Sequence, residues 1–422
     1  MKKFIIQKSL ISISLMLVLM GLFISSCKKD NNNEGGKGAP TIKNLRAITA
    51  APNDSVLTKV GPGQVVVIQG SNLQTVNAIY FSGVQATFNS ALVADDNVVI
   101  TVPAVDFSKI NADQKNKIRL VTNYGEVTFT LPLLPPPPII SGVSNDYTAA
   151  GQTLTISGQY LYLINDVTFP GGSKGTNLVT TSTGTSITVT VPTGVTTGSL
   201  TVNGQGGTAI YKPYNDKVTG IACNFDDVFT YQYYSGNLTN DATLYPGNNG
   251  NYVQLTVNNL SVNDYAWYNG GRSINLNPVQ WVPVASLGDL VSNWALKFEI
   301  NVKEPWKAGT IMIRRDESGG WGFLARYEPW KASTTGSFST NGWITVTIPF
   351  TQFKLPSGGL NGTGASATTL KQLLDTEGDQ LTSVGDKQGK RGVSFMLIND
   401  SGTTPVGKVD MAIDNIRFVK TN

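Results

Sequence analysis

The chain has 422 residues, which is too long for one ordinary domain and long enough for two to four domains with cores of their own. Its 32 basic and 28 acidic residues leave a formal net charge of +4, so no strong electrostatic field predicts a nucleic-acid partner. The sequence contains no histidine, which excludes Ser-His-Asp and Cys-His catalysis and every histidine-based metal site.

Residues 1–26 have the pattern of an export signal, so they are not expected to form part of the folded domains. Basic residues come first, an apolar stretch covers residues 10–24, and small residues lead to Cys27. The ending Ile24-Ser25-Ser26-Cys27 resembles the lipobox of bacterial lipoproteins. That resemblance implies cleavage before Cys27, acylation of its thiol and new amine, and attachment to a membrane by lipid. A plain signal peptide or an uncleaved anchor is the alternative.

Residues 27–39 are polar and glycine-rich, which predicts a flexible tether. Lys28-Lys29-Asp30 is similar to the short charged stretch that often directs lipoproteins of Bacteroidota-type bacteria to the outer face of the outer membrane. The resemblance implies a position on the outer membrane, facing the cell exterior. Cys223 is the other cysteine of the sequence, so we expect the domains to be stabilised by their cores.

Two segments of the chain repeat one another. GQVVVIQGSNLQTVNAIYFSG (63–83) and GQTLTISGQYLYLINDVTFPG (151–171) share their glycines, a leucine, a phenylalanine and the apolar positions between them. Alternating apolar residues separated by glycines predict short strands in a small immunoglobulin-like sandwich. The pattern resembles the IPT/TIG domain family, whose members are often stacked as spacers.

The repeat predicts a first sandwich over residues 40–134 and a second over 135–216. Between them, the run LLPPPP (133–138) is expected to be a stiff joint that holds the two sandwiches apart. Neither copy contains a tryptophan, a cluster of aromatic residues or a paired carboxylate. A spacer role is therefore favoured over a binding role for both.

Residues 217–422 differ in composition, because all seven tryptophans of the chain lie there. WALKFEINV (294–302) alternates, which places Trp294 with the apolar residues on the core face of a strand. GWITVTIPF (342–350) also alternates, and Trp343 falls on its polar face. Trp281 has apolar neighbours and is expected to be buried.

One short helix is predicted over residues 367–378, and the rest of this segment reads as strands. The predicted fold class is therefore all-β. Two tandem immunoglobulin-like sandwiches are followed by a larger, jelly-roll type β-sandwich over residues 217–422.

The ends of the last domain, CNFDDVF (223–229) and VDMAIDNIRFV (409–419), suggest paired first and last strands. Such a pairing resembles jelly-roll carbohydrate-binding modules, in which nearby aspartates can hold a structural Ca²⁺. The resemblance implies Asp226, Asp227, Asp410 and Asp414 as oxygen ligands. The alternative is that these carboxylates end strands and face water, since no calcium-loop motif accompanies them. No other cofactor is expected.

The pentapeptide EPWKA occurs twice, at 304–308 and at 328–332. Proline cannot donate to a strand ladder, so Trp306 and Trp330 are expected on loops just past strand ends. Two strands joined by the turn DESGG (316–320) would return the chain to the same rim, with both indoles side by side. Exposed indoles stack on the C–H face of a pyranose while nearby polar groups bond its hydroxyls. The suitable neighbours are Glu304, Lys307, Arg314, Glu328 and Lys331.

Each of these two indoles has an alternative role, which is to cap the core from its edge. DYAWYNGG (264–271) is a further candidate, because Tyr265, Trp267 and Tyr268 precede an Asn-Gly-Gly turn. Trp321 follows two glycines and is expected to flank the groove in which the glycan would lie beside these aromatic residues. The predicted glycan-binding residues are Trp267, Tyr268, Trp306, Trp321 and Trp330.

The order of lipobox, IPT/TIG-like repeats, proline run and tryptophan-rich sandwich resembles the surface glycan-binding lipoproteins of Bacteroidota polysaccharide-uptake systems. The last domain resembles their xyloglucan-binding domain. The resemblance implies a non-catalytic protein that captures a plant-type glycan, xyloglucan or another β-glycan, beside an outer-membrane glycan transporter. It assigns Trp267, Trp306 and Trp330 as binding platforms.

Two other functions remain open. A jelly-roll glycoside hydrolase requires two carboxylates that flank the scissile bond, and Glu304 and Glu328 are the pair to consider. Each precedes a proline at a strand end, which is a loose place to mount catalysis. A structural adhesin is the third function, and it predicts no affinity for any glycan.

Overall fold

The computed structural model describes residues 37–421 except 233–235, 249, 317–321 and 376–387, so the signal segment and Cys27 lie outside the described residues. The described chain is built almost entirely from antiparallel strands, which confirms the predicted all-β class. It divides into two compact units, one ending at Pro135 and one beginning at Pro136. No helix in the described part has the length and hydropathy of a membrane span.

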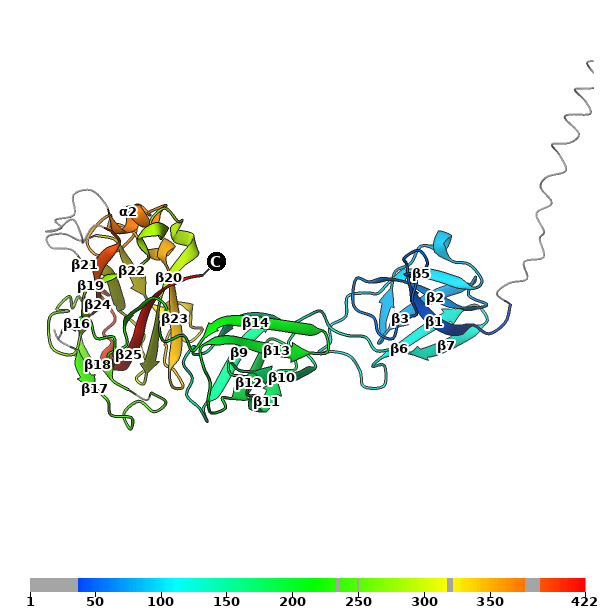
Figure 1. Ribbon diagram of the computed structural model, residues 1–422, viewed down its shortest axis with the longest axis horizontal. Coiled ribbons are helices and arrows are strands. Elements are labelled where there is room, and N and C mark those ends of the chain that lie inside the picture. Colours follow the sequence, from blue (N-terminus) through cyan, green and yellow to red (C-terminus); the bar gives the residue numbers. More distant parts are fainter. Residues whose placement is uncertain (1–36, 233–235, 249, 317–321, 376–387, 422) are drawn as a thin grey trace, which may run out of the picture. The chain divides into compact units, whose positions relative to one another are not determined.

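The first unit is a sandwich of two sheets that enclose one apolar core (Figure 1). Leu133, from the proline-rich run, is buried in this core, and the Leu134 amide donates to the Val60 carbonyl at 2.9 Å. The run therefore begins as part of the first unit. The sheets have the orders β1-β2-β5 and β4-β3-β6-β7. The elements are β1 (Thr41–Ala47), β2 (Val65–Ser71), β3 (Val76–Phe81), β4 (Val84–Ala86), η1 (Ser90–Leu92), β5 (Asn97–Thr101), β6 (Lys117–Thr122) and β7 (Gly125–Thr130).

The second unit begins with a sandwich that repeats this arrangement, with the orders β11-β12-β9-β8 and β10-β13-β14. One strand differs, since β4 pairs with β3 in the first sandwich whereas β11 pairs with β12 in the second. The strands are β8 (Ile139–Val143), β9 (Thr153–Gln159), β10 (Ile164–Thr168), β11 (Thr176–Thr180), β12 (Ser186–Thr190), β13 (Gly198–Gly204) and β14 (Gly207–Tyr214).

One shared point of the sequence repeat, a glycine, is explained by a close backbone contact that occurs in both sandwiches. A Cβ added at Gly70 would lie 1.8 Å from the Thr41 carbonyl oxygen, and one added at Gly158 would lie 1.9 Å from that of Ile139. The register of β1 against β2, and of β8 against β9, shifts beside these contacts. A glycine is required at both positions because the bulged neighbouring strand occupies the space of a side chain.

The terminal domain, which follows in the second unit, packs a six-stranded sheet against a five-stranded sheet (Figure 1). The six-stranded sheet has the order β17-β18-β25-β20-β23, with β15 also paired to β25. It comprises β15 (Ile221–Cys223), β17 (Asn237–Thr239), β18 (Tyr252–Leu260), β20 (Trp294–Val302), β23 (Ile344–Pro349) and β25 (Gly407–Lys420). The five-stranded sheet has the order β16-β19-β24-β21-β22. It comprises β16 (Tyr231–Gln232), β19 (Ser273–Gln280), β21 (Thr310–Asp316), β22 (Leu324–Tyr327) and β24 (Lys390–Ile398).

A large apolar core fills the space between the two sheets, and it contains Trp281 and Trp294 as predicted. Trp281 stacks on Phe418 with ring centroids 4.3 Å apart, an arrangement in which flat rings bury a large apolar area. The predicted helix is present as α2 (Leu370–Leu374), where Thr369 and Gln372 form a capping box. The short 3-10 helices are η2 (Val284–Ser286), η3 (Val291–Asn293), η4 (Pro329–Ala332) and η5 (Phe350–Gln352).

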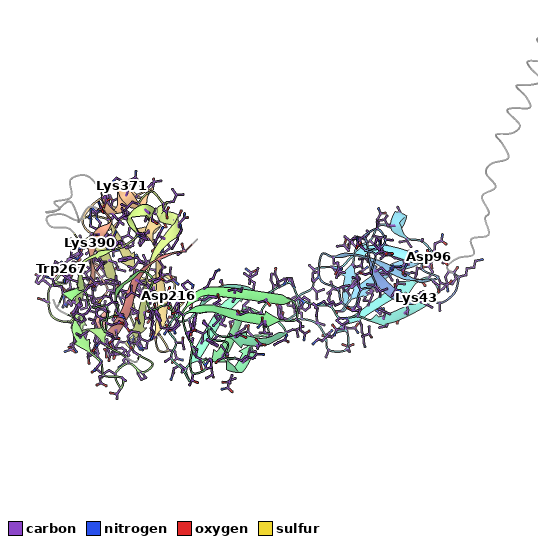
Figure 2. All side chains as sticks on the ribbon, in the orientation of Figure 1. Lys43, Asp96, Asp216, Trp267, Lys371 and Lys390 are labelled. Atoms are coloured by element: carbon purple, nitrogen blue, oxygen red, sulfur yellow. The ribbon has the colours of Figure 1, made fainter. Side chains whose placement is uncertain are left out.

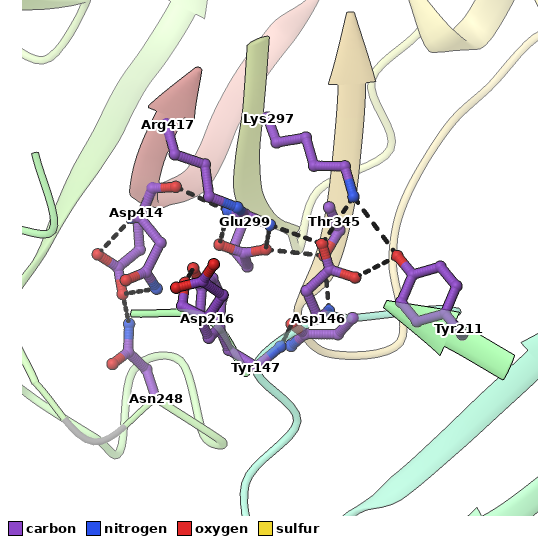
Figure 3. A network of polar contacts seen from close by, with 12 residues as sticks. Asp146, Tyr147, Tyr211, Asp216, Asn248, Lys297, Glu299, Thr345, Asp414 and Arg417 are labelled. Atoms are coloured by element: carbon purple, nitrogen blue, oxygen red, sulfur yellow. Dashed lines mark hydrogen bonds and ion pairs between the residues drawn. The ribbon is translucent and has the colours of Figure 1, made fainter. Parts of the chain in front are cut away.

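A buried ion network joins the second sandwich to the outer face of the six-stranded sheet (Figure 3). The Arg417 guanidinium, only 3% exposed, lies 2.8 Å from a Glu299 oxygen and 2.9 Å from Asp146 of the second sandwich. Lys297 binds the same Asp146 oxygen at 2.8 Å, and the Tyr211 hydroxyl donates to Asp146 at 2.6 Å. Two cations and two carboxylates therefore balance one another out of water, which is the condition under which buried charges are tolerated.

The same junction protects the edge strand β23. The Thr345 amide donates to the Ser144 carbonyl at 2.9 Å, and the Asp146 amide donates to Thr345 Oγ1 at 2.8 Å. The Tyr147 hydroxyl donates to the backbone of Asp216, which lies in the connection to the terminal domain. Because an unpaired sheet edge is a template for aggregation, this contact gives the second sandwich a structural task beyond spacing.

We expect Arg417→Ala to destabilise the terminal domain by about 3–5 kcal/mol, because it leaves the Glu299 and Asp146 carboxylates buried without their main cation. Chemical unfolding followed by tryptophan fluorescence reports on this domain alone, since all seven tryptophans lie there. The matched control is Arg119→Ala, which removes an exposed pair with Glu126 in the first sandwich and should leave the fluorescence curve unchanged. A loss below about 1 kcal/mol for Arg417→Ala would contradict a coupled network.

Candidate functional site

The outer face of the six-stranded sheet is covered. The second sandwich occupies the part around Arg417, and the segment before β18 covers the part around Trp343. Tyr245, Tyr252 and Trp343 form an aromatic cluster there, in which the Trp343 indole donates to the Tyr245 carbonyl at 3.2 Å. Trp343 is on the polar face of its strand, as its sequence predicted, but it is buried under this segment. This face is closed to a polymer.

The five-stranded sheet presents a different outer face. Alternate residues of its strands, such as Ile311 and Phe395, point into the core, so their neighbours point outward. Three of the outward residues, Met312, Leu324 and Met396, form a second apolar cluster on that side of the sheet. Trp267 and Leu360, from two loops outside the sheet, pack against them. The outward side chains are Ser273, Asn275, Met312, Arg314, Leu324, Arg326, Ser394 and Met396.

On this face a largely polar row lies next to a row that contains Met312 and Met396, because the strands are in register. One row across the sheet is Asn275, Ser394, Arg314 and Leu324. The Ser394 hydroxyl is buried and has no hydrogen-bond partner among the described residues. Ser394 is only 1% exposed, and Met312, Leu324 and Met396 are buried as well, so this outward layer lies beneath the loops that carry Trp267 and Leu360.

An aromatic loop borders this face. Tyr265 and Tyr268 are exposed, the latter to 60%, while Trp267 is half-buried and makes an edge contact with Tyr268 at 5.6 Å. Figure 2 shows Trp267 on the far side of the terminal domain from Asp216, which marks the end that joins the second sandwich. Trp267 and Tyr268 were predicted as binding residues, and their rings lie together on the outer side of the five-stranded sheet, where Trp267 packs on the buried methionines.

Trp306 is not available to a ligand, so the prediction that it projects into solvent is wrong. It is 1% exposed, belongs to the main core and makes an edge contact with Tyr327. Its indole donates to the Ala308 carbonyl at 2.6 Å, which satisfies the one polar group of the ring inside the protein. Trp306 therefore caps the core from its edge, which was the alternative role expected for this residue.

Trp330 lies in η4, is half-buried and packs against the same core. Its indole donates to the Gly309 carbonyl at 2.9 Å, next to the carbonyl that accepts from Trp306. The hairpin of β21 and β22 does return the chain to one rim, as expected, but both rings turn inward there. Trp321 lies outside the described residues.

The two glutamates of the pentapeptides have separate partners. Glu304 pairs with Lys408 of the six-stranded sheet at 2.9 Å. Glu328 pairs with Arg326 at 2.8 Å and with Lys331 at 2.6 Å, beside the five-stranded sheet. Each carboxylate is held by cations of a different sheet, an arrangement unlike two groups that face one scissile bond.

Three of the four aspartates proposed for calcium line one cavity of about 300 Å³ between the second sandwich and the six-stranded sheet: Asp226, Asp227 and Asp414. Asp410 lies elsewhere, where Tyr245 and Gln254 donate to its carboxylate. The four do not form one ligand set. Within the described residues, no three Asp, Glu, Cys or His side chains gather so as to hold a metal ion.

Asp414 is nonetheless unusual, because it is a buried carboxylate whose described hydrogen bonds come from neutral amides. Asn248 donates to it at 2.8 Å, and Asn415 donates through its backbone and its side chain. Burial raises the pKa of Asp414 well above its usual value, and the nearby Glu299 and Asp226 carboxylates raise it further, against the effect of the amide donors. Asp414 is therefore poised to hold a proton.

Known proteins share this architecture. Residues 214–420 match the family described as the surface glycan-binding protein B xyloglucan binding domain, and residues 54–131 match the IPT/TIG domain. The terminal domain is therefore similar to the xyloglucan binding domain of that family. These two matches occur in the order that the resemblance to the surface glycan-binding lipoproteins implied.

Solved structures agree with this fold. A surface glycan-binding protein, PbSGBP-B of Prevotella bryantii, has a TM-score of 0.63 at 20% identity, over 92% of this chain and 100% of that one. SGBP-B from a complex xyloglucan utilization locus of Bacteroides uniformis has a TM-score of 0.51 at 20% identity, over 90% and 99%. An IPT/TIG domain-containing protein of Bacteroides ovatus is 29% identical over 154 residues, which span 36% of this chain and 31% of that relative.

The sequence did not predict the buried outward layer of the five-stranded sheet. Met312, Ser394 and Met396 carry no motif, and the tryptophans drew attention to the loops instead. The pattern that could have indicated them is the alternation in TIMIRRD and KRGVSFMLI. In both strands apolar residues occur on the two faces, so each face is expected to pack against something. Only the pairing of the strands in the sheet shows which of the two faces points away from the core.

We expect Trp306→Ala to cost about 3–5 kcal/mol of stability and to leave glycan affinity of the folded protein unchanged, because Trp306 fills the core rather than the site. Denaturant unfolding followed by intrinsic fluorescence measures the first, and affinity electrophoresis below the unfolding transition measures the second. Trp330→Ala is the paired variant and should cost less, since its ring is half-buried. A stable Trp306→Ala variant that lost glycan affinity would contradict this assignment.

The raised pKa of Asp414 predicts a dependence of stability on pH. The folded protein holds the proton while the unfolded chain releases it near pH 4, so this group lowers stability as pH rises from about 4 towards its folded pKa. In Asp414→Asn that loss is absent. The free energy of unfolding of Asp414→Asn, relative to the native protein, should therefore increase between about pH 4 and 7.

Tryptophan-monitored denaturation over this pH range checks the prediction for Asp414. Asp106→Asn, in the first sandwich, is the control and should leave the fluorescence curve unchanged at every pH. A difference between Asp414→Asn and the native protein that is flat across the range would mean that Asp414 is ionised in the folded state.

Proposed function

We propose that the protein is a non-catalytic, cell-surface protein that captures a β-glucan of the xyloglucan type on the outer face of the five-stranded sheet. The observation that carries the proposal is the position of Trp267 and Tyr268 beside a sheet face that mixes apolar and polar side chains. Aromatic rings cover the C–H faces of glucosyl units, and polar side chains beside the rings bond their hydroxyls. Residues 214–420 match a family that is named for xyloglucan binding, which supports this ligand class.

The remaining parts of the chain fit a display function. Lipidation at Cys27 would hold the protein on the outer membrane, and the tether over residues 27–39 would place the sandwiches outside it. An outer-membrane glycan transporter is the partner that such a display would serve. A structural Ca²⁺ stays an untested expectation, and the described positions of Asp226, Asp227, Asp410 and Asp414 give it no support.

Xyloglucan and mixed-linkage β-glucan should each retard the native protein in affinity electrophoresis, whereas an α-glucan should not. Trp267→Ala should weaken the retardation about tenfold or more, because it removes the ring that packs on the sheet face. Tyr124→Ala, an exposed tyrosine of the first sandwich, is the matched control and should have no effect.

The same samples separate this function from the two alternatives. Release of reducing sugar, abolished by Glu304→Gln or Glu328→Gln, would overturn the binding function in favour of a hydrolase. Failure of the native protein to bind any β-glucan of the panel would overturn it in favour of an adhesin.

A further inference from the structure

A buried ion pair fixes the aromatic loop that precedes β19. The Arg272 guanidinium donates to Asp264 Oδ1 at 2.7 Å and to the Ala266 carbonyl at 3.3 Å. The same Asp264 oxygen accepts from the Ala266 amide at 3.1 Å. Both side chains of the pair are largely buried, at 10% and 17% exposure. One arginine therefore binds both the carboxylate and the backbone of the turn that leads into Trp267.

The backbones of both residues of this ion pair are hydrogen-bonded to the end of β24 in the five-stranded sheet. The backbones of Asp264 and Asn399 exchange two hydrogen bonds, of 2.8 and 2.9 Å, just beyond the end of β24. The Leu397 amide donates to the Arg272 carbonyl at 2.8 Å, so the arginine backbone is held by the same strand. The Asp264–Arg272 pair thus spans the loop between two points that the five-stranded sheet keeps in place.

Glycine closes the loop at its other end. Gly271 has φ +79°, a conformation that other residues rarely adopt. A Cβ at this position would lie 2.1 Å from the Thr256 carbonyl oxygen of the six-stranded sheet. The backbone of the loop over residues 264–271 is therefore constrained on both sides, which fixes where its three aromatic residues begin relative to the sheet.

We propose that Arg272 is a positioning residue for glycan binding, which holds Trp267 and Tyr268 in a binding-ready arrangement before the ligand arrives. The inference rests on the proposed function, since Arg272 itself is turned into the loop and acts through the aromatic rings. A platform ordered in advance loses less conformational freedom on binding, so the ion pair raises affinity without touching the polysaccharide.

The test uses Arg272→Lys in the full chain, because lysine keeps the charge but its shorter side chain ends before the position of Arg272 Nη1, the nitrogen that donates to both Asp264 and the Ala266 carbonyl. We expect Arg272→Lys to weaken binding to xyloglucan by roughly tenfold in titration calorimetry, the scale on which supporting residues act in other sites. In a Trp267→Ala background the same substitution should have almost no further effect. Arg119→Ala, an arginine of the first sandwich, is the control for loss of a surface pair.

Hydrogen exchange of the peptide over residues 264–271 supplies a readout that does not depend on a ligand. We expect Arg272→Lys to speed exchange in that peptide while the peptides of β21 and β24 keep their protection. Unchanged exchange, or an equal loss of affinity with and without Trp267, would overturn the positioning role alone. Faster exchange in a protein whose native form binds neither xyloglucan nor mixed-linkage β-glucan would overturn the proposed function and the inference together.

Discussion

The buried contact of Arg417 with Glu299 and Asp146 decides how the terminal domain is used. It commits the outer face of the six-stranded sheet to the second sandwich, because four charges that have left water can be stable only while they neutralise one another. The aromatic cluster around Trp343 closes the rest of that face. On the five-stranded sheet the outward cluster of Met312, Leu324 and Met396 is buried under two loops, and one of these loops carries the exposed Tyr265 and Tyr268.

The two sandwiches built from the sequence repeat differ in their roles. In both, a glycine at the same point of the repeat allows a bulged strand to approach closely, so the fold is copied down to a local backbone contact. In the second copy the segment after β8 also carries Ser144, Asp146 and Tyr147, which bind the edge strand β23 and the ion network. The second sandwich therefore helps to stabilise the terminal domain, and a spacer role would come in addition to that.

Tryptophan was a poor guide to the binding surface because one residue type serves two purposes in this domain. Trp281, Trp294 and Trp306 are buried in the main core, and the indole of each donates to a protein oxygen. Trp267 differs in its surroundings, since it packs on the outward methionines of a sheet beside an exposed tyrosine. The second kind of position leaves part of a flat ring exposed, which is the condition for stacking on a sugar.

By itself the sequence determined the all-β class, the repeat, the alternation of the strands and the resemblance to surface glycan-binding proteins, because these depend on local period and on the order of segments. It also placed Trp267 and Tyr268 on an unusual loop. Only the tertiary structure decided that Trp306 is core, that Asp410 is apart from Asp414, and that Met312, Ser394 and Met396 face outward. The reason is physical: alternation assigns residues to two faces of a strand, but which face meets the core is set by contacts with strands far away in the chain.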